Sequence, residues 1–232
     1  MKRMSTKTTV ITSIALVVVL LGGAAAVFGP AFYRDVIVGP AAAAPVDDLG
    51  TVAPSTLTAD ELAGEWTVSA GSYAGYRVDE VLNGTDVTVT ARTETVTGTI
   101  TATATEITAV SIDVDVASIA TDEAARDNYF RTQAIDTATN PTATFVLTEP
   151  ITAPADPTSG ESQTVSATGI LTLNGVSKDV TVDLTAALDG DGVKIAGQIP
   201  ITFSDFNVTA PNLGFVKVED AGSIDVLLNL TK

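Results

Sequence analysis

The sequence of 232 residues contains neither cysteine nor histidine. Without cysteine the protein has no disulfide, no thiol nucleophile, no thiolate metal site and no lipid attached through sulfur. Without histidine it lacks the Ser-His-Asp relay and the imidazole ligand that zinc and copper most often use. These absences exclude the commonest hydrolase and transition-metal sites, and they leave the core alone to stabilise the fold.

Basic residues are also scarce. The formal net charge is -16, and from Asp47 onward eight basic residues stand against 27 acidic ones, which leaves the body near -19. A body this acidic repels phosphate backbones, so we expect no nucleic-acid partner. About 170 residues follow the first 60 or so, enough for one domain with a sizeable core.

One long uncharged run covers residues 10–29. As a helix, such a run spans about 30 Å, the hydrocarbon thickness of a bilayer. Lys2, Arg3 and Lys7 precede it, which predicts a cytoplasmic segment at 1–9 and a body outside the cytoplasm. A cleaved signal peptide is the alternative, because it too begins with basic residues. We expect either a single-pass protein of the cell membrane or a secreted protein.

Residues 30–63 are rich in alanine, proline and small polar residues, which is typical of a linker. Thr58 is placed to cap one short helical turn near the end of this segment, with acidic residues in the first turn. The domain proper is therefore expected over residues 64–232.

Alternation of apolar and polar residues dominates the body. Over residues 110–116, 180–184 and 224–230 every second residue is Val, Ile or Leu, and those between are mostly Ser, Thr, Asp or Asn. The dipeptide at 174–175 and the turn within 189–192 predict hairpins. The pattern predicts an all-β protein of about eight to ten antiparallel strands. It does not separate a barrel from a sandwich, or a solid barrel from a hollow one.

The stretch RDNYFRTQAIDTATNPTATF, residues 126–145, breaks this alternation. Two adjacent aromatic residues, Tyr129 and Phe130, lie among charges, and Pro141 marks the start of the next strand. We expect an insert between two strands. Its aromatic pair would cover an open end of the core or line the access to a ligand there.

Residues 169–184, GILTLNGVSKDVTVDL, resemble a segment typical of the YceI-like family, roughly G-x-L-T-[IL]-x-G-V-[ST]-K-x-V. Arg126-Asp127 and the Pro-x-Ala-x-Phe of residues 141–145 resemble that family's second signature. The resemblance covers about residues 64–232. It implies an eight-stranded antiparallel, lipocalin-like barrel with a short helical insert. It also implies export, and in several members a polyisoprenoid or quinone-like chain held inside the barrel.

The sequence departs from the family at several polar positions. Where histidines are usual it has Gly71-Ser72, Tyr129-Phe130 and Asn174, and where an arginine is usual it has Ser204. The family's scaffold is therefore expected here, whereas the contacts to a ligand's head group do not carry over.

We expect the protein to enclose a long isoprenoid lipid or quinone in an apolar barrel, without catalysis, metal or other cofactor. About ten buried methylenes would contribute ~8 kcal/mol before ordering costs. The candidate lining and mouth residues are Tyr76, Val78, Val114, Tyr129, Phe130, Phe145, Val182, Leu184, Ile201, Phe203, Phe206, Val226 and Leu228.

Two other functions stay open from the sequence. One is a structural or interaction module with a solid core. The sequence also leaves open whether the protein forms a homodimer. The other is an enzyme, which would require a buried carboxylate with a raised pKa, and the spacing of acids identifies none. The acidic turn within 189–192 lacks the further carboxylates of a calcium loop, so we interpret it as a tight turn.

Overall fold

The computed structural model describes residues 41–232, apart from positions 83, 155, 159 and 215. The cytoplasmic segment at 1–9 and the apolar helix expected over 10–29 lie outside the described residues. Among the helices within the described part, none is long and apolar enough to cross a membrane.

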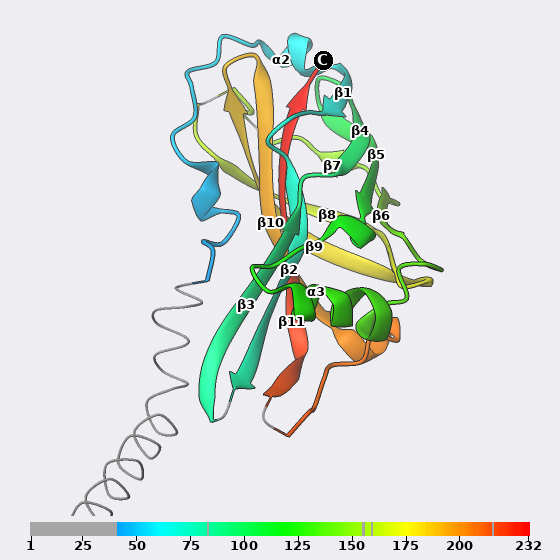
Figure 1. Cartoon of the computed structure of the whole chain (residues 1–232). Coiled ribbons are helices and arrows are strands. Elements are labelled where there is room, and N and C mark those ends of the chain that lie inside the picture. Colours follow the sequence, from blue (N-terminus) through cyan, green and yellow to red (C-terminus); the bar gives the residue numbers. More distant parts are fainter. Residues whose placement is uncertain (1–40, 83, 155, 159, 215) are drawn as a thin grey trace, which may run out of the picture.

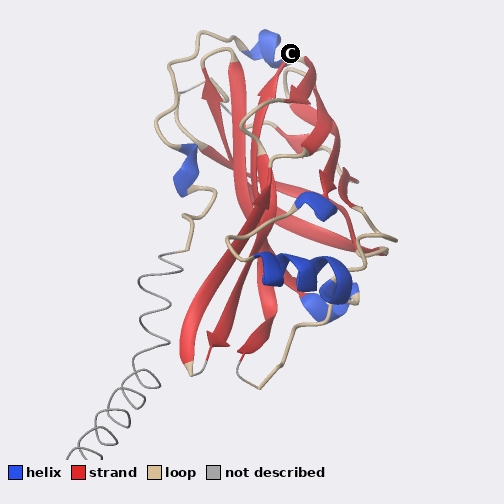
Figure 2. Cartoon of the chain, in the orientation of Figure 1, coloured by secondary structure: helices blue, strands red, loops and turns tan. Residues whose placement is uncertain are grey.

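The described residues form one antiparallel sheet that closes on itself (Figures 1 and 2). Its strands are β1 (Gly64–Val68), β2 (Tyr73–Leu82), β3 (Thr85–Thr93), β4 (Val96–Ala102), β5 (Glu106–Asp115), β6 (Thr142–Leu147), β7 (Ile151–Thr152), β8 (Gln163–Leu173), β9 (Val176–Asp189), β10 (Gly192–Thr202) and β11 (Val216–Thr231). The ring runs β1-β4-β5-β6-β8-β9-β10-β11 and returns to β1, so the expected eight-stranded barrel is confirmed.

Strand β11 is long enough to pair with two strands in succession. Its C-terminal end lies opposite β1, where Val68 faces Leu230, and its earlier part lies opposite β2, where Leu82 faces Val216. Strand β2 turns back into β3, and this hairpin extends with β11 beyond the ring (Figure 1). One end of the barrel is thereby flared.

The helices are short and lie at the ends and edges of the barrel (Figure 2). Strands β5 and β6 are joined by the insert that the sequence predicted, and within it Ile135 N–H donates to Phe130 O at 2.9 Å, one π-helical turn. The helical segments are η2 (Asp47–Leu49), α2 (Ala59–Leu62), η3 (Val116–Ser118), α3 (Ala124–Tyr129), η4 (Phe130–Ala134) and η5 (Phe203–Phe206).

The β8–β9 hairpin turns at Asn174 and Gly175, as the sequence predicted. Both residues have positive φ, 50° and 75°, which a two-residue type I′ turn requires. The Asn174 amide donates to Asn207 O at 3.1 Å, and its oxygen accepts from the Asn140 amide at 3.2 Å. This one side chain therefore links the end of the insert to the residue that follows η5.

Residues 42–53, which we call the strap, lie against the outside of the barrel. Arg77 Nη2 donates to Ala42 O at 2.8 Å, and Arg92 Nη1 contacts Asp48 Oδ2 at 3.1 Å. Farther along, Ala53 N–H donates to Asp189 Oδ1 at 2.6 Å. The described part of the expected 30–63 linker is thus attached to the barrel, and the domain boundary at 64 stays a prediction.

The strap covers a buried ion pair on the outer wall. Asp225 is 1% exposed, and its Oδ2 lies 3.0 Å from Arg77 Nη2. The other carboxylate oxygen accepts from Gln198 Nε2 at 2.9 Å and from Ser223 Oγ at 3.2 Å. Side chains on β2, β10 and β11 therefore supply the hydrogen bonds that the buried Asp225 carboxylate requires.

Candidate ligand-binding site

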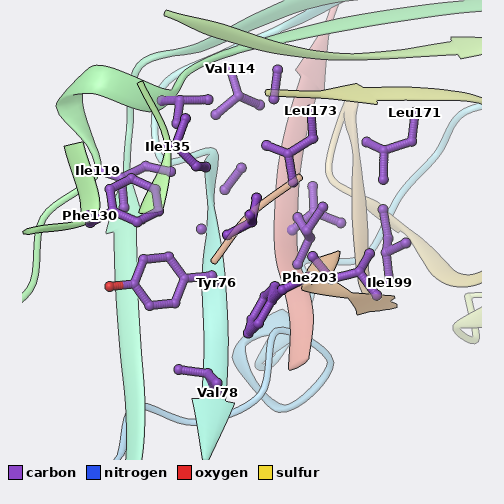
Figure 3. Close-up of a pocket in the computed structure, with 18 of the residues that line it drawn as sticks. Tyr76, Val78, Val114, Ile119, Phe130, Ile135, Leu171, Leu173, Ile199 and Phe203 are labelled. Atoms are coloured by element: carbon purple, nitrogen blue, oxygen red, sulfur yellow. The ribbon is translucent and has the colours of Figure 1, made fainter. Parts of the chain in front are cut away.

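The barrel is hollow. A cavity of about 1050 Å³ runs through its interior and is lined by residues from each strand from β2 to β11 (Figure 3). Eight-stranded barrels are wide enough to hold a small ligand when the inward side chains are modest in size. Ala74, Ala143 and Ala167 point inward on three separate strands and leave this space open.

The predicted lining residues meet in this cavity, with one exception. Phe206 is buried in the core beside the cavity and does not line it. Whether the lining residues contact a ligand stays a prediction. Those that line the cavity are Tyr76, Val78, Val114, Tyr129, Phe130, Phe145, Val182, Leu184, Ile201, Phe203, Val226 and Leu228.

The aromatic pair of the insert borders the flared end of the cavity. The Phe130 ring lies 5.0 Å from the Tyr76 ring, centroid to centroid, at an interplanar angle of 30° (Figure 3). Burial raises the pKa of Tyr76 to about 12, so its hydroxyl stays protonated at neutral pH. The insert is thereby held against β2 by ring contact, and a hydroxyl donor stands beside that contact.

Among the described residues that line the cavity, three are charged: Glu80, Glu123 and Arg126. Glu80 is only 6% exposed, and its Oε1 lies 3.6 Å from Arg126 Nη2. Burial raises the pKa of Glu80, and the nearby Arg126 guanidinium opposes that rise. Arg126 Nη1 also lies 3.3 Å from Asp122 Oδ1, so the guanidinium is shared between two carboxylates.

Arg126 and Asp127, the two residues of the Arg-Asp signature, have different structural roles. Arg126 faces the cavity, whereas Asp127 is buried and accepts hydrogen bonds from Thr121 N at 2.8 Å and Thr121 Oγ1 at 2.7 Å. The Asp127 carboxylate fixes the loop that leads into α3. This loop in turn sets the position from which Arg126 reaches Glu80.

Glu80 was not among the lining residues predicted from the sequence, although the sequence contains a signal for it. Glu80 follows Tyr76 and Val78 at a spacing of two, so it shares their inward face of β2. An acid in phase with apolar residues is the pattern that identifies it. The other lining residues that were not selected include Ile119, Ile135, Leu171, Leu173 and Ile199.

A second core cluster with Trp66 lies toward the opposite end of the barrel. Trp66 is 3% exposed there, and its indole N–H donates to Leu62 O at 2.9 Å. A small pocket of about 130 Å³ remains beside it. The residues common to this pocket and the main cavity are Ile100, Ile107, Ile151, Val165 and Ile195. These branched side chains lie between the main cavity and the small pocket and narrow the interior there.

The arrangement suits enclosure of a long apolar group whose end meets Glu80, Arg126 and Tyr76. Glu80 is a buried carboxylate with a raised pKa, the kind of group that acid–base chemistry would require. In the described part of the chain, no group of three or more His, Cys, Asp or Glu side chains could hold a metal ion.

Comparison with known proteins agrees with this architecture. A polyisoprenoid-binding domain from Saccharophagus degradans, implicated in plant cell wall breakdown, superposes with a TM-score of 0.57 at 18% identity, covering 72% of this chain and 97% of that one. BcnA from Burkholderia cenocepacia superposes with a TM-score of 0.51 at 25% identity, covering 66% and 95%. No curated protein matches the sequence. The sequence profile of the YceI-like domain matches residues 66–230, and the chain therefore belongs to the YceI-like family.

Proposed function

We propose that the protein binds a long polyisoprenoid or quinone-like lipid inside its barrel, outside the cytoplasm and without catalysis. The observation that carries this proposal is the apolar cavity of about 1050 Å³. Ligand pockets commonly measure about 300–1,000 Å³, so this one is large enough for a long chain. The S. degradans domain has the same fold and binds a polyisoprenoid, which supports the same class of ligand here.

Affinity in such a site comes mainly from the chain. Each methylene removed from water contributes about 0.8 kcal/mol, so about ten contribute ~8 kcal/mol before the ordering costs of binding. A charged anchor is therefore not required to hold the lipid. The absence of the family's usual histidines affects the choice of head group more than the strength of binding.

The location outside the cytoplasm rests on the sequence. Lys2, Arg3 and Lys7 precede the apolar run at 10–29, which favours a cytoplasmic N-terminus. Protease added to intact cells should degrade the barrel if it lies on the outer side of the membrane, once any cell wall or outer membrane has been removed. A barrel that becomes accessible only after cell lysis would contradict export.

Lipid extraction tests the binding. The full chain is purified from its own membranes and extracted with organic solvent, and the extract is analysed by mass spectrometry. The control is a variant in which Ala143 and Ala167 are both replaced by Trp, which fills the cavity from β6 and β8. We expect an isoprenoid-length lipid with the wild type and its loss with the control.

Two outcomes would overturn this function. One is an empty wild-type extract together with no uptake of a long-chain isoprenoid from vesicles. The other is turnover of the lipid that disappears in a Glu80→Gln variant, because catalysis would then replace simple binding.

A further inference from the structure

We infer that the cavity selects isoprenoids whose polar end is uncharged, such as an alcohol or a quinone, over those that end in a phosphate. The geometry assigns this selection to Glu80. The inference rests on the proposed function and specifies the ligand class of the same site.

Glu80 lies on the interior wall where a head group would rest. It projects from β2 on the same face as Tyr76 and Val78, and it lines the cavity while being almost completely buried. Of the charged side chains on the described lining, Glu80 and Glu123 are acidic and Arg126 is basic. The wall of the site therefore carries more negative than positive charge.

Arg126, the one cation on the described lining, is already paired with carboxylates. Arg126 lies 3.6 Å from Glu80 and 3.3 Å from Asp122, through different guanidinium nitrogens. A phosphate that approached Arg126 would also approach both carboxylates. Like charges repel more strongly in a site shielded from water than on an exposed surface, so the phosphate gains little and loses its hydration.

An uncharged head group finds matching partners in the same place. The Tyr76 hydroxyl has no hydrogen-bond partner among the described residues, and it lies beside the Phe130 ring at the flared end. It can donate to a carbonyl or hydroxyl oxygen, and the Glu80 carboxylate can accept from a hydroxyl. Neither bond requires the Arg126–Glu80 pair to break.

Competition between two matched lipids tests the inference. The full-length chain in amphipol is incubated with equal amounts of geranylgeraniol and geranylgeranyl phosphate, then captured and washed, and the bound lipids are quantified by mass spectrometry. Nonspecific uptake is subtracted with the Ala143→Trp/Ala167→Trp variant. We expect at least a tenfold excess of bound alcohol over bound phosphate.

Two substitutions should move this ratio in opposite directions. Glu80→Gln removes the negative charge and frees Arg126, so the excess of alcohol should fall at least tenfold. Arg126→Gln removes the cation and should raise the excess. Asp79→Asn changes the net charge equally from the exposed face of β2 and should leave the ratio as in the wild type.

The outcomes separate the inference from the function on which it rests. Binding of the phosphate as strong as that of the alcohol overturns the selection while leaving lipid binding intact. A folded Glu80→Gln variant with an unchanged ratio of bound alcohol to bound phosphate overturns the role of Glu80. If Asp79→Asn changes the ratio as much as Glu80→Gln does, the selection depends only on net charge and the inference is also overturned. If neither lipid binds above the filled-cavity variant, the proposed function itself fails.

Discussion

Replacing Ala167 by Phe should stabilise the lipid-free protein, although the side chain becomes much larger. Ala167 is buried on β8 and faces the cavity, so the added ring would enter empty space. Full burial of a Phe side chain contributes about 1.5–3 kcal/mol, and part of that gain is lost to imperfect packing and the ordering of the ring. We therefore expect the free energy of unfolding to rise by about 1 kcal/mol.

Gly169 is the matched control because it lies two residues farther along the same face of β8. A methyl group there would meet Val146 O at 2.5 Å and the Phe145 ring at 2.6 Å. Gly169→Ala should therefore cost about 1–3 kcal/mol, the usual penalty of overpacking. We therefore expect Ala167→Phe, which adds the larger side chain, to stabilise the protein and Gly169→Ala to destabilise it.

Urea unfolding of the delipidated variants measures both values. Lipid uptake from vesicles by Ala167→Phe should fall, because the ring occupies part of the site. If Ala167→Phe destabilises the protein as much as Gly169→Ala does, the interior is packed and the cavity does not exist in solution.

Three further predictions concern the mouth of the barrel and its hairpins. Phe130→Ala removes a ring contact with Tyr76 worth about 0.5–1.5 kcal/mol, so bound lipid should transfer to vesicles roughly two- to tenfold faster, and an unchanged release rate would contradict the role of the ring. Because burial raises the pKa of Glu80, its contribution to stability is present at low pH and is lost as the pH rises through the folded pKa. The free energy of unfolding of the wild type minus that of Glu80→Gln should therefore fall as the pH rises above about 4.3, the ordinary pKa of a glutamate, and a constant difference would refute the shift. Asn174→Ala removes three hydrogen bonds at a residue with a φ of 50° and should cost about 2 kcal/mol, which a thermal melt will show as a lower Tm; a Tm equal to that of the wild type would show that this link is dispensable.

The barrel could be predicted from the sequence because its determinants are local or carried by recognisable segments. The alternation along each strand decides which side chains point inward, and the Asn174-Gly175 turn fixes one register. Even the two family signatures prove to be in contact, since Phe145 lies opposite Leu171 and its ring occupies the space beside Gly169.

The hollow interior could not be predicted in this way. It depends on which side chains meet across the barrel, and small residues such as Ala74, Ala143 and Ala167 come from strands far apart in the sequence. Alternation shows that a side chain points inward, but it does not show whether a side chain from another strand fills the space in front of it. Glu80 was not predicted because inward positions are recognised by their apolar side chains, and Glu80 is an acid on the inward face of β2.

The attachment of the strap to the barrel could not be predicted from the composition of residues 30–63, because part of it is made by the backbone. The contacts to Arg77 are made by the backbone carbonyls of Ala42 and Ala43, which any residue would offer. What the sequence did contain was their partners on β2 and β3, two arginines in a body with few basic residues.

The packing contacts of the barrel therefore extend beyond the segment that is matched to the family. The family match begins at residue 66, whereas Leu49 packs against Tyr73, Ala196 and Leu227 on the outer wall of the barrel. A fragment cut at the family boundary would expose this apolar patch and uncover the Arg77–Asp225 pair beneath it. Truncations intended to keep these contacts should begin no later than Ala42, whose carbonyl accepts from Arg77.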